Sequence, residues 1–114
     1  MLAQDLIWQE RLSRSAGQAG VEPARAGTAP EFDLALVDAG LAIVDLTARA
    51  YDPLAAIERA ASIGVHVLAV GQHDDVELRK RALERGADRV LSYRKVFEDG
   101  PATIRAWVEA AAAR

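Results

Sequence analysis

Residues 41–45 read Leu-Ala-Ile-Val-Asp and residues 65–70 read Val-His-Val-Leu-Ala-Val, two nearly uninterrupted apolar runs in a highly charged chain. Apolar runs of this length, with β-branched residues and no polar alternation, are typical of strands that are covered on both faces. Between them, Asp52-Pro53 offers a helix N-cap followed by a first-turn proline, and Gly64 offers a stop. A strand, a helix and a strand in this order predict two parallel strands joined by a right-handed crossover.

The same alternation continues on both sides of this unit. Four further helices are predicted at residues 6–19, 28–39, 74–86 and 101–113, and three further strands at residues 1–4, 21–26 and 90–91. Five strands that alternate with five helices predict a three-layer αβα sandwich of the flavodoxin-like class, with parallel strands in the order 2-1-3-4-5. Two strands are weak, because Met1–Gln4 is short for a central strand and Pro23 cannot donate to a ladder.

Composition limits the classes of function. The chain has 114 residues, 14 Lys and Arg against 17 Asp and Glu, and no Cys. We expect a single domain over residues 1–114, with neither a disulfide nor a thiolate metal site. A net charge of −3 without a basic cluster argues against nucleic acid as a partner. No apolar run approaches the roughly 20 residues that span a bilayer, and no basic, apolar leader begins the chain, so we expect a cytoplasmic protein without a membrane partner.

Two carboxylates follow the predicted first and third strands. In an open parallel sheet, ligands bind beyond the carboxyl ends of the strands, at the point where the winding direction reverses. Asp5 and Asp45 fall at this point, so we expect them to lie close together, with His73 and residues 92–95 on the rim. Each carboxylate could instead be a helix cap or a member of a loop ion pair, and Asp45 could form such a pair with Arg49.

Two stretches of the chain resemble one known family. Residues 42–46, with Asp52-Pro53 beginning seven residues after Asp45, are similar to the phosphoacceptor strand and loop of bacterial response-regulator receiver domains, often called CheY-like. Residues 81–91, Arg-Ala-Leu-Glu-Arg-Gly-Ala-Asp-Arg-Val-Leu, are similar to the fourth helix, Gly-Ala turn and fifth strand of that family. The resemblance covers nearly the whole chain.

The resemblance implies a site of five polar groups. A working receiver has two acids after strand one that hold Mg²⁺, an aspartate after strand three, a Ser or Thr after strand four and a Lys after strand five. Asp45 stands at the phosphoacceptor position and Asp5 at one acid position, where they are the candidate Mg²⁺ ligands. The other positions differ, since Gln4 replaces the second acid, Gly71 the hydroxyl and Tyr93 the lysine.

We therefore interpret the chain as a stand-alone pseudo-receiver that keeps the fold without phosphoryl switching, needs no cofactor and acts through protein contacts. No nucleophile lies beside a base in any motif, so we expect no enzymatic activity. Two alternatives stay open. A functional receiver would use Asp45 and Mg²⁺, with Arg94 or Lys95 in place of the lysine. A small-molecule-binding module would use the same crevice.

A protein partner or a homodimer requires an exposed surface on the helices. The candidates are Trp8 on the first predicted helix, and Trp107 and Val108 on the last. Trp107 also shares a helical stripe with Ile104 and Ala111, which indicates a role in the core instead.

Overall fold

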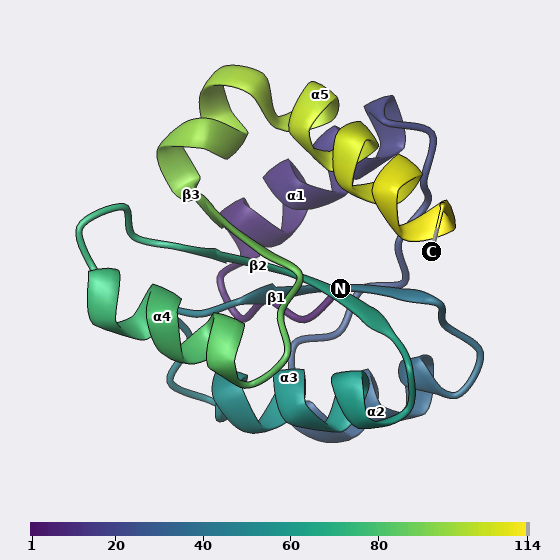
Figure 1. The fold of residues 1–114 in the computed structure, drawn as a ribbon, viewed down its shortest axis with the longest axis vertical. Coiled ribbons are helices and arrows are strands. Elements are labelled where there is room, and N and C mark those ends of the chain that lie inside the picture. Colours follow the sequence, from purple (N-terminus) through teal and green to yellow (C-terminus); the bar gives the residue numbers. More distant parts are fainter. Residues whose placement is uncertain (114) are drawn as a thin grey trace.

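The computed structural model describes residues 1–113. Its elements, drawn in Figure 1, are α1 (Leu6–Gln18), α2 (Ala29–Leu36), β1 (Leu41–Asp45), α3 (Pro53–Ser62), β2 (His66–Gly71), α4 (Val76–Glu84), β3 (Arg89–Ser92) and α5 (Tyr93–Ala112). The three strands are parallel and lie in the order β1-β2-β3. Leu41 lies opposite His66, and Leu68 lies opposite Arg89.

Helices cover both faces of the sheet. In Figure 1, α1 and α5 lie above it, and α2, α3 and α4 lie below it. Successive strand residues point to opposite layers. Val44 therefore packs in a cluster with Phe32 and Ile57, whereas its neighbour Ile43 packs in a cluster with Trp107. The predicted α/β architecture of parallel strands between two helical layers is confirmed.

The predicted number of strands was wrong, because within residues 1–113 three strands form and not five. The first and second predicted strands are reduced to isolated parallel bridges, from Leu2 to Val44 on one side and to Ala26 on the other. Asp5 leaves the sheet to cap α1, which ends the first segment early. Pro23 removes a backbone donor from the second. The segments still lie in the predicted order, because Leu2 lies between Ala26 and Val44 of β1.

The beginning of α5 also differs from the prediction. The helix begins at Tyr93 and not at Pro101, because the Ser92 side chain accepts a hydrogen bond from the Lys95 N–H at 3.0 Å and caps it. Pro101 lies inside the helix, and Asp99 has the non-helical angles φ −152° and ψ 35°. A proline ring removes one hydrogen bond and clashes with the preceding turn, so α5 bends here.

Two other boundaries move slightly. α4 is capped by Asp75, which accepts from the Leu78 N–H at 3.0 Å, and not by its neighbour Asp74. α2 ends at Leu36, three residues before the predicted end at Ala39.

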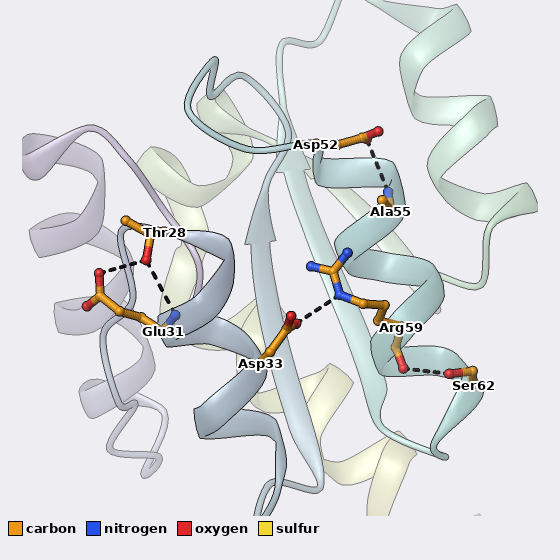
Figure 2. A network of polar contacts seen from close by, with 7 residues as sticks. All are labelled: Thr28, Glu31, Asp33, Asp52, Ala55, Arg59 and Ser62. Carbon is orange, nitrogen blue, oxygen red and sulfur yellow. Dashed lines mark hydrogen bonds and ion pairs between the residues drawn. The ribbon is translucent and has the colours of Figure 1, made fainter.

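The predicted caps of α2 and α3 are confirmed, as Figure 2 shows. Thr28 accepts from the Glu31 N–H and donates to the Glu31 carboxylate at 2.9 Å, and Asp52 accepts from the Ala55 N–H at 3.1 Å. An ion pair of 2.9 Å between Arg59 and Asp33 joins the two helices. Among residues 1–113, no helix is both long and apolar enough to cross a membrane.

Candidate functional site

Asp45 ends β1 at the carboxyl edge of the sheet and lies inside the protein, since it is 1% exposed. Its Oδ1 atom accepts hydrogen bonds from the Thr47 backbone N–H at 3.0 Å and from the Thr47 hydroxyl at 2.9 Å. The Tyr93 hydroxyl donates to the same oxygen. Burying a carboxylate is costly unless donors replace the lost water. These three donors supply that compensation.

Tyr93 is the first residue of α5, and the Ser92 cap places it over the end of β1. Its hydroxyl contacts the Thr47 hydroxyl as well as Asp45. Its ring lies against Trp8 of α1, with the ring centroids 4.0 Å apart and the planes inclined by 31°. Burial, followed by the hydrogen bond to Asp45, raises the pKa of Tyr93 above its usual range. The phenol therefore stays protonated and remains a donor.

Tyr51 is a second buried phenol at this edge. Its hydroxyl donates to the Asp45 backbone carbonyl at 2.8 Å and lies 3.3 Å from the Leu2 carbonyl. Burial, followed by the charge of Asp45, raises the pKa of Tyr51 above its usual range. Tyr51 thus joins the loop before α3 to the ends of two adjacent sheet segments.

Gln4 holds the backbone of the loop that follows Asp45. Its Oε1 atom accepts from the Arg49 N–H at 2.8 Å and from the Ala50 N–H at 3.1 Å. The predicted ion pair between Arg49 and Asp45 is wrong. The Arg49 side chain is exposed and forms no ion pair within residues 1–113, because Gln4 fixes the loop through its backbone while Thr47 and Tyr93 satisfy the carboxylate.

Leu46 fills the space beside Gly71, the residue at the predicted hydroxyl position. A Cβ atom built on Gly71 would lie 3.1 Å from Leu46 Cδ1 and 3.4 Å from Leu46 Cβ. Leu46 is buried. A side chain at position 71 would therefore have to displace a packed leucine before it could reach Asp45.

The remaining predicted rim residues are not assembled around Asp45. Asp5 is exposed and caps α1, accepting from the Ile7 and Trp8 N–H groups at 2.9 and 3.0 Å. Arg94 pairs with Glu98 at 2.9 Å, and Lys95 pairs with Asp99 at 3.8 Å, both along α5. His73 is exposed in the loop between β2 and α4. The structure brings Asp45 and Tyr93 together, and Asp5 lies close enough for its charge to contribute to the raised pKa of Tyr93.

The predicted interface residues occupy different environments. Trp107 is 1% exposed, and its Nε1–H donates to Asp88 Oδ2 at 3.3 Å, so it belongs to the core and offers no surface to a partner. Trp8 and Val108 are half-buried. Only these two present part of their side chains to solvent.

Solved structures with the same arrangement of helices and strands are numerous. A putative response regulator from Chloroflexus aurantiacus has a TM-score of 0.83 at 21% identity, over 99% of this chain and 94% of that one. The beryllofluoride-activated NtrC4 receiver domain dimer has a TM-score of 0.80 at 18% identity, over 96% and 94%. A Burkholderia pseudomallei response regulator with a phosphorylated aspartic acid has a TM-score of 0.71 at 18% identity, over 98% and 70%.

This chain has the receiver-domain fold. No family model matches its sequence, and no curated protein does. The resemblance to receivers is therefore confirmed through the fold.

Several of the oxygens at this edge that could hold a divalent cation already accept hydrogen bonds. Mg²⁺ requires several oxygen ligands in an octahedral array. Asp45 Oδ1 already accepts three hydrogen bonds, Gln4 Oε1 accepts two, and Asp5 caps a helix. Across residues 1–113, no three acidic, histidine or cysteine side chains gather into a metal site.

Three residues of this edge were not predicted, namely Leu46, Thr47 and Tyr51. Thr47 had a usable signal, because a Thr two residues after an Asp can form a turn closed by the carboxylate. Tyr51 directly precedes the Asp52 cap, so its place in the chain was predictable, but the direction of its side chain was not. The packing of Leu46 against Gly71 depends on the register between β1 and β2, which the sequence does not specify.

Proposed function

We propose that this chain is a pseudo-receiver, a signalling module that acts through protein contacts and uses Asp45 as a structural anion. One observation carries the proposal, namely that Asp45 is 1% exposed and its Oδ1 atom is engaged by Tyr93 and Thr47. The receiver fold makes a signalling role the natural class, and receivers as a group are binding modules and not enzymes.

Phosphoryl transfer to an aspartate requires an accessible carboxylate oxygen and cationic groups around the transferred oxygens. At this edge, a neutral phenol occupies the place expected for an ammonium. The two cations predicted to replace the lysine, Arg94 and Lys95, pair with carboxylates on α5. Gly71 contributes no hydroxyl, and Leu46 fills the space beside it. These features support loss of phosphoryl chemistry and of the cation that assists it.

The test is exposure of the purified chain to acetyl phosphate and Mg²⁺, followed by electrophoresis on a phosphate-affinity gel. We expect no shifted band under conditions that fully shift the NtrC4 receiver domain. A shifted band that disappears in the Asp45→Asn variant would overturn the proposal and establish a functional phosphoacceptor. Titration calorimetry with Mg²⁺ provides a second readout, and we expect no binding heat at millimolar concentration.

The surface joined to the Asp45 cluster is the face of α1 and the first turns of α5. The Arg11 guanidinium lies 5.3 Å from the Trp8 ring centroid and 5.6 Å from that of Phe97. Leu6, Ile7 and Phe97 are exposed by 77%, 65% and 74%. Large exposed apolar side chains that gather on one face are typical of protein contacts. This face is the proposed partner surface.

Light scattering at high micromolar concentration separates two kinds of partner. A monomer would exclude a homodimer and leave a different protein as the partner. A dimer that is lost in Phe97→Ser but kept in Val76→Ser would assign a homodimer to this face, because Val76 is similarly exposed, at 69%, but lies at the start of α4. A dimer that survives Phe97→Ser would contradict the proposed surface.

A further inference from the structure

Arg11 of α1 differs from the cations around it. Three neighbouring cations of α1 and α5 each pair with a carboxylate four residues away on their own helix, namely Arg14, Arg94 and Lys95. Arg11 is exposed, and within residues 1–113 it forms no ion pair. Its guanidinium lies instead over two aromatic rings, 5.3 Å from the Trp8 centroid and 5.6 Å from the Phe97 centroid. Arg11 is therefore a cation whose contacts are ring faces and not an anion.

The rings hold this guanidinium in a defined position. Trp8 is half-buried, and its ring lies against the Tyr93 ring with the centroids 4.0 Å apart. The Tyr93 hydroxyl in turn donates to the buried Asp45, so the support beneath Arg11 extends into the Asp45 cluster. A guanidinium that is stacked on rings still offers the N–H groups at its edge to a carboxylate, and its planar fork loses little freedom when that bond forms.

Exposed apolar side chains surround this cation. Leu6 and Ile7 line a shallow hollow of about 360 Å³ on α1 together with Arg11, and the exposed ring of Phe97 lies on the other side of the guanidinium. Aromatic and arginine side chains carry much of the binding energy in protein interfaces. A segment that covers this face would therefore bury apolar surface and would also remove Arg11 from water.

The charges of the face indicate what the occupant must carry. Removing a cation from water is costly unless an anion replaces the lost water. The nearby acid Glu10 already pairs with Arg25 at 2.9 Å and with Arg14 at 3.7 Å. Asp5 accepts hydrogen bonds from two backbone N–H groups at the start of α1. The anion for Arg11 must therefore come from the occupant.

A second copy of the chain is a poor source of this anion. In a two-fold contact the same patch lies on both sides of the interface, so two Arg11 guanidinium groups would approach each other. Glu10 of each copy would have to leave its own arginines before it could separate them. A segment of another protein that carries a carboxylate among apolar side chains matches both the cation and the apolar surface.

Given the partner surface assigned to the pseudo-receiver, on which this step rests, we propose that this surface binds a segment of another protein in which a glutamate or aspartate lies between apolar side chains. The carboxylate of the segment accepts from the Arg11 guanidinium, and its apolar side chains cover Leu6, Ile7 and Phe97. Arg11 thereby sets the specificity of the surface. An amide in place of the carboxylate leaves the covered cation without an anion, and an ammonium adds a like charge.

The experiment uses three acetylated and amidated peptides that differ at one position, serine-leucine-X-leucine-phenylalanine-serine, where X is glutamate, glutamine or lysine. Binding to the whole chain is measured from the NMR shift of the Trp8 indole N–H. We expect the glutamate peptide to bind about fivefold more tightly than the glutamine peptide, and the lysine peptide to bind most weakly.

Two variants assign the preference to one side chain. In Arg11→Gln, the glutamate and glutamine peptides should bind equally. Arg14→Gln changes a paired arginine of the same helix and should keep the preference for glutamate. Because both arginines are exposed, we expect each variant to keep the thermal midpoint of the unchanged chain.

Four results would overturn the proposal. Three concern the peptides, namely equal affinity for glutamate and glutamine in the unchanged chain, a preference that survives in Arg11→Gln, and no binding of any peptide. The fourth is a dimer in light scattering that Arg11→Gln abolishes, which would assign the face to a second copy. The phosphate-affinity gel reports on Asp45 and not on Arg11, so failure of the peptides leaves the loss of phosphoryl chemistry intact, and a phosphorylated Asp45 leaves the peptide preference intact.

Discussion

The two ends of the sheet differ in how completely their polar groups are satisfied. At the carboxyl end, Asp45, Thr47, Tyr93 and Tyr51 form a closed cluster, and a carboxylate lies buried with three donors on one oxygen. At the amino end, mostly apolar side chains surround a cavity of about 460 Å³, and within residues 1–113 the Ile43 N–H has no backbone partner. In this chain, the carboxyl end of the sheet, where a working receiver accepts its phosphoryl group, is the end whose polar groups are satisfied.

The two ends of the sheet are therefore expected to differ in rigidity. A closed polar network fixes a single arrangement, because each lost partner leaves a buried group unsatisfied. An apolar cavity has no such polar partners to fix it. We therefore expect the carboxyl end to be the more rigid of the two.

The largest expected effect comes from removing the Asp45 carboxylate at the carboxyl end of the sheet. Asp45→Ala leaves the buried Tyr93 hydroxyl without its carboxylate acceptor and removes the acceptor of the Thr47 N–H and hydroxyl, and we expect a loss of about 3 kcal/mol in the free energy of unfolding. Urea denaturation measures it. Asp45→Asn keeps an acceptor oxygen in place, and we expect a loss of only about 1 kcal/mol. Equal losses in the two variants would contradict the structural role of this oxygen.

The next prediction tests whether Leu46 blocks a side chain at position 71. Gly71→Thr forces its Cβ against Leu46 Cδ1, at 3.1 Å before relaxation, and we expect a destabilisation of about 2 kcal/mol from overpacking. The same substitution in a Leu46→Ala background should cost clearly less, because the conflicting side chain is absent. A double-mutant cycle from urea denaturation gives this coupling. Additive costs would argue against Leu46 as the obstacle.

The amino end should show a pH dependence of stability. Burial lowers the pKa of the Met1 amine from 8.0 to about 6, so between these values the unfolded chain binds the proton and the folded chain does not. Stability therefore rises as pH increases from 6 to 8, by about 1 to 2 kcal/mol. Urea denaturation across this range measures it, and an N-terminally acetylated chain is the control. An unchanged slope after acetylation would assign the effect to another group.

The smallest expected effect is measured by absorbance on the folded protein. The chain has two tyrosines, and the pKa of each is raised by burial. Near-ultraviolet absorbance should therefore show no phenolate in the folded protein at about pH 10, where free tyrosine is half ionised. Because the unfolded chain does ionise there, stability should fall as pH rises through this value. A phenolate signal before unfolding that is absent in Tyr93→Phe would show that Tyr93 is open to solvent.

Much of the fold was predictable because its signals are local. The apolar runs of β1 and β2 specify buried strands, and Thr28 and Asp52 specify helix starts that the structure confirms. Local signals fail where two compete. Asp74 and Asp75 are adjacent cap candidates, and Pro101 masked the true start of α5 at the Ser92 cap.

The site was less predictable because it depends on contacts between distant segments. The sequence placed Asp45 at the end of a strand and Tyr93 after another, and the structure joins them. It could not show that Asp5 would serve α1 as a cap, since the same carboxylate satisfies either role until the helix start is fixed. Arg49 was a reasonable cation for Asp45 by distance along the chain, but Gln4 holds its backbone and leaves its side chain in solvent.

The bend of α5 at Asp99 divides this helix into two lengths. Both lengths contribute to one apolar cluster, Tyr93 and Val96 from the first and Ile104 and Trp107 from the second, and Tyr93 also donates to Asp45. Because helical hydrogen bonding is interrupted between them, a twist of the first length is not transmitted rigidly to the second. We therefore expect the bend to absorb a small movement of the first length without a matching rotation of the second.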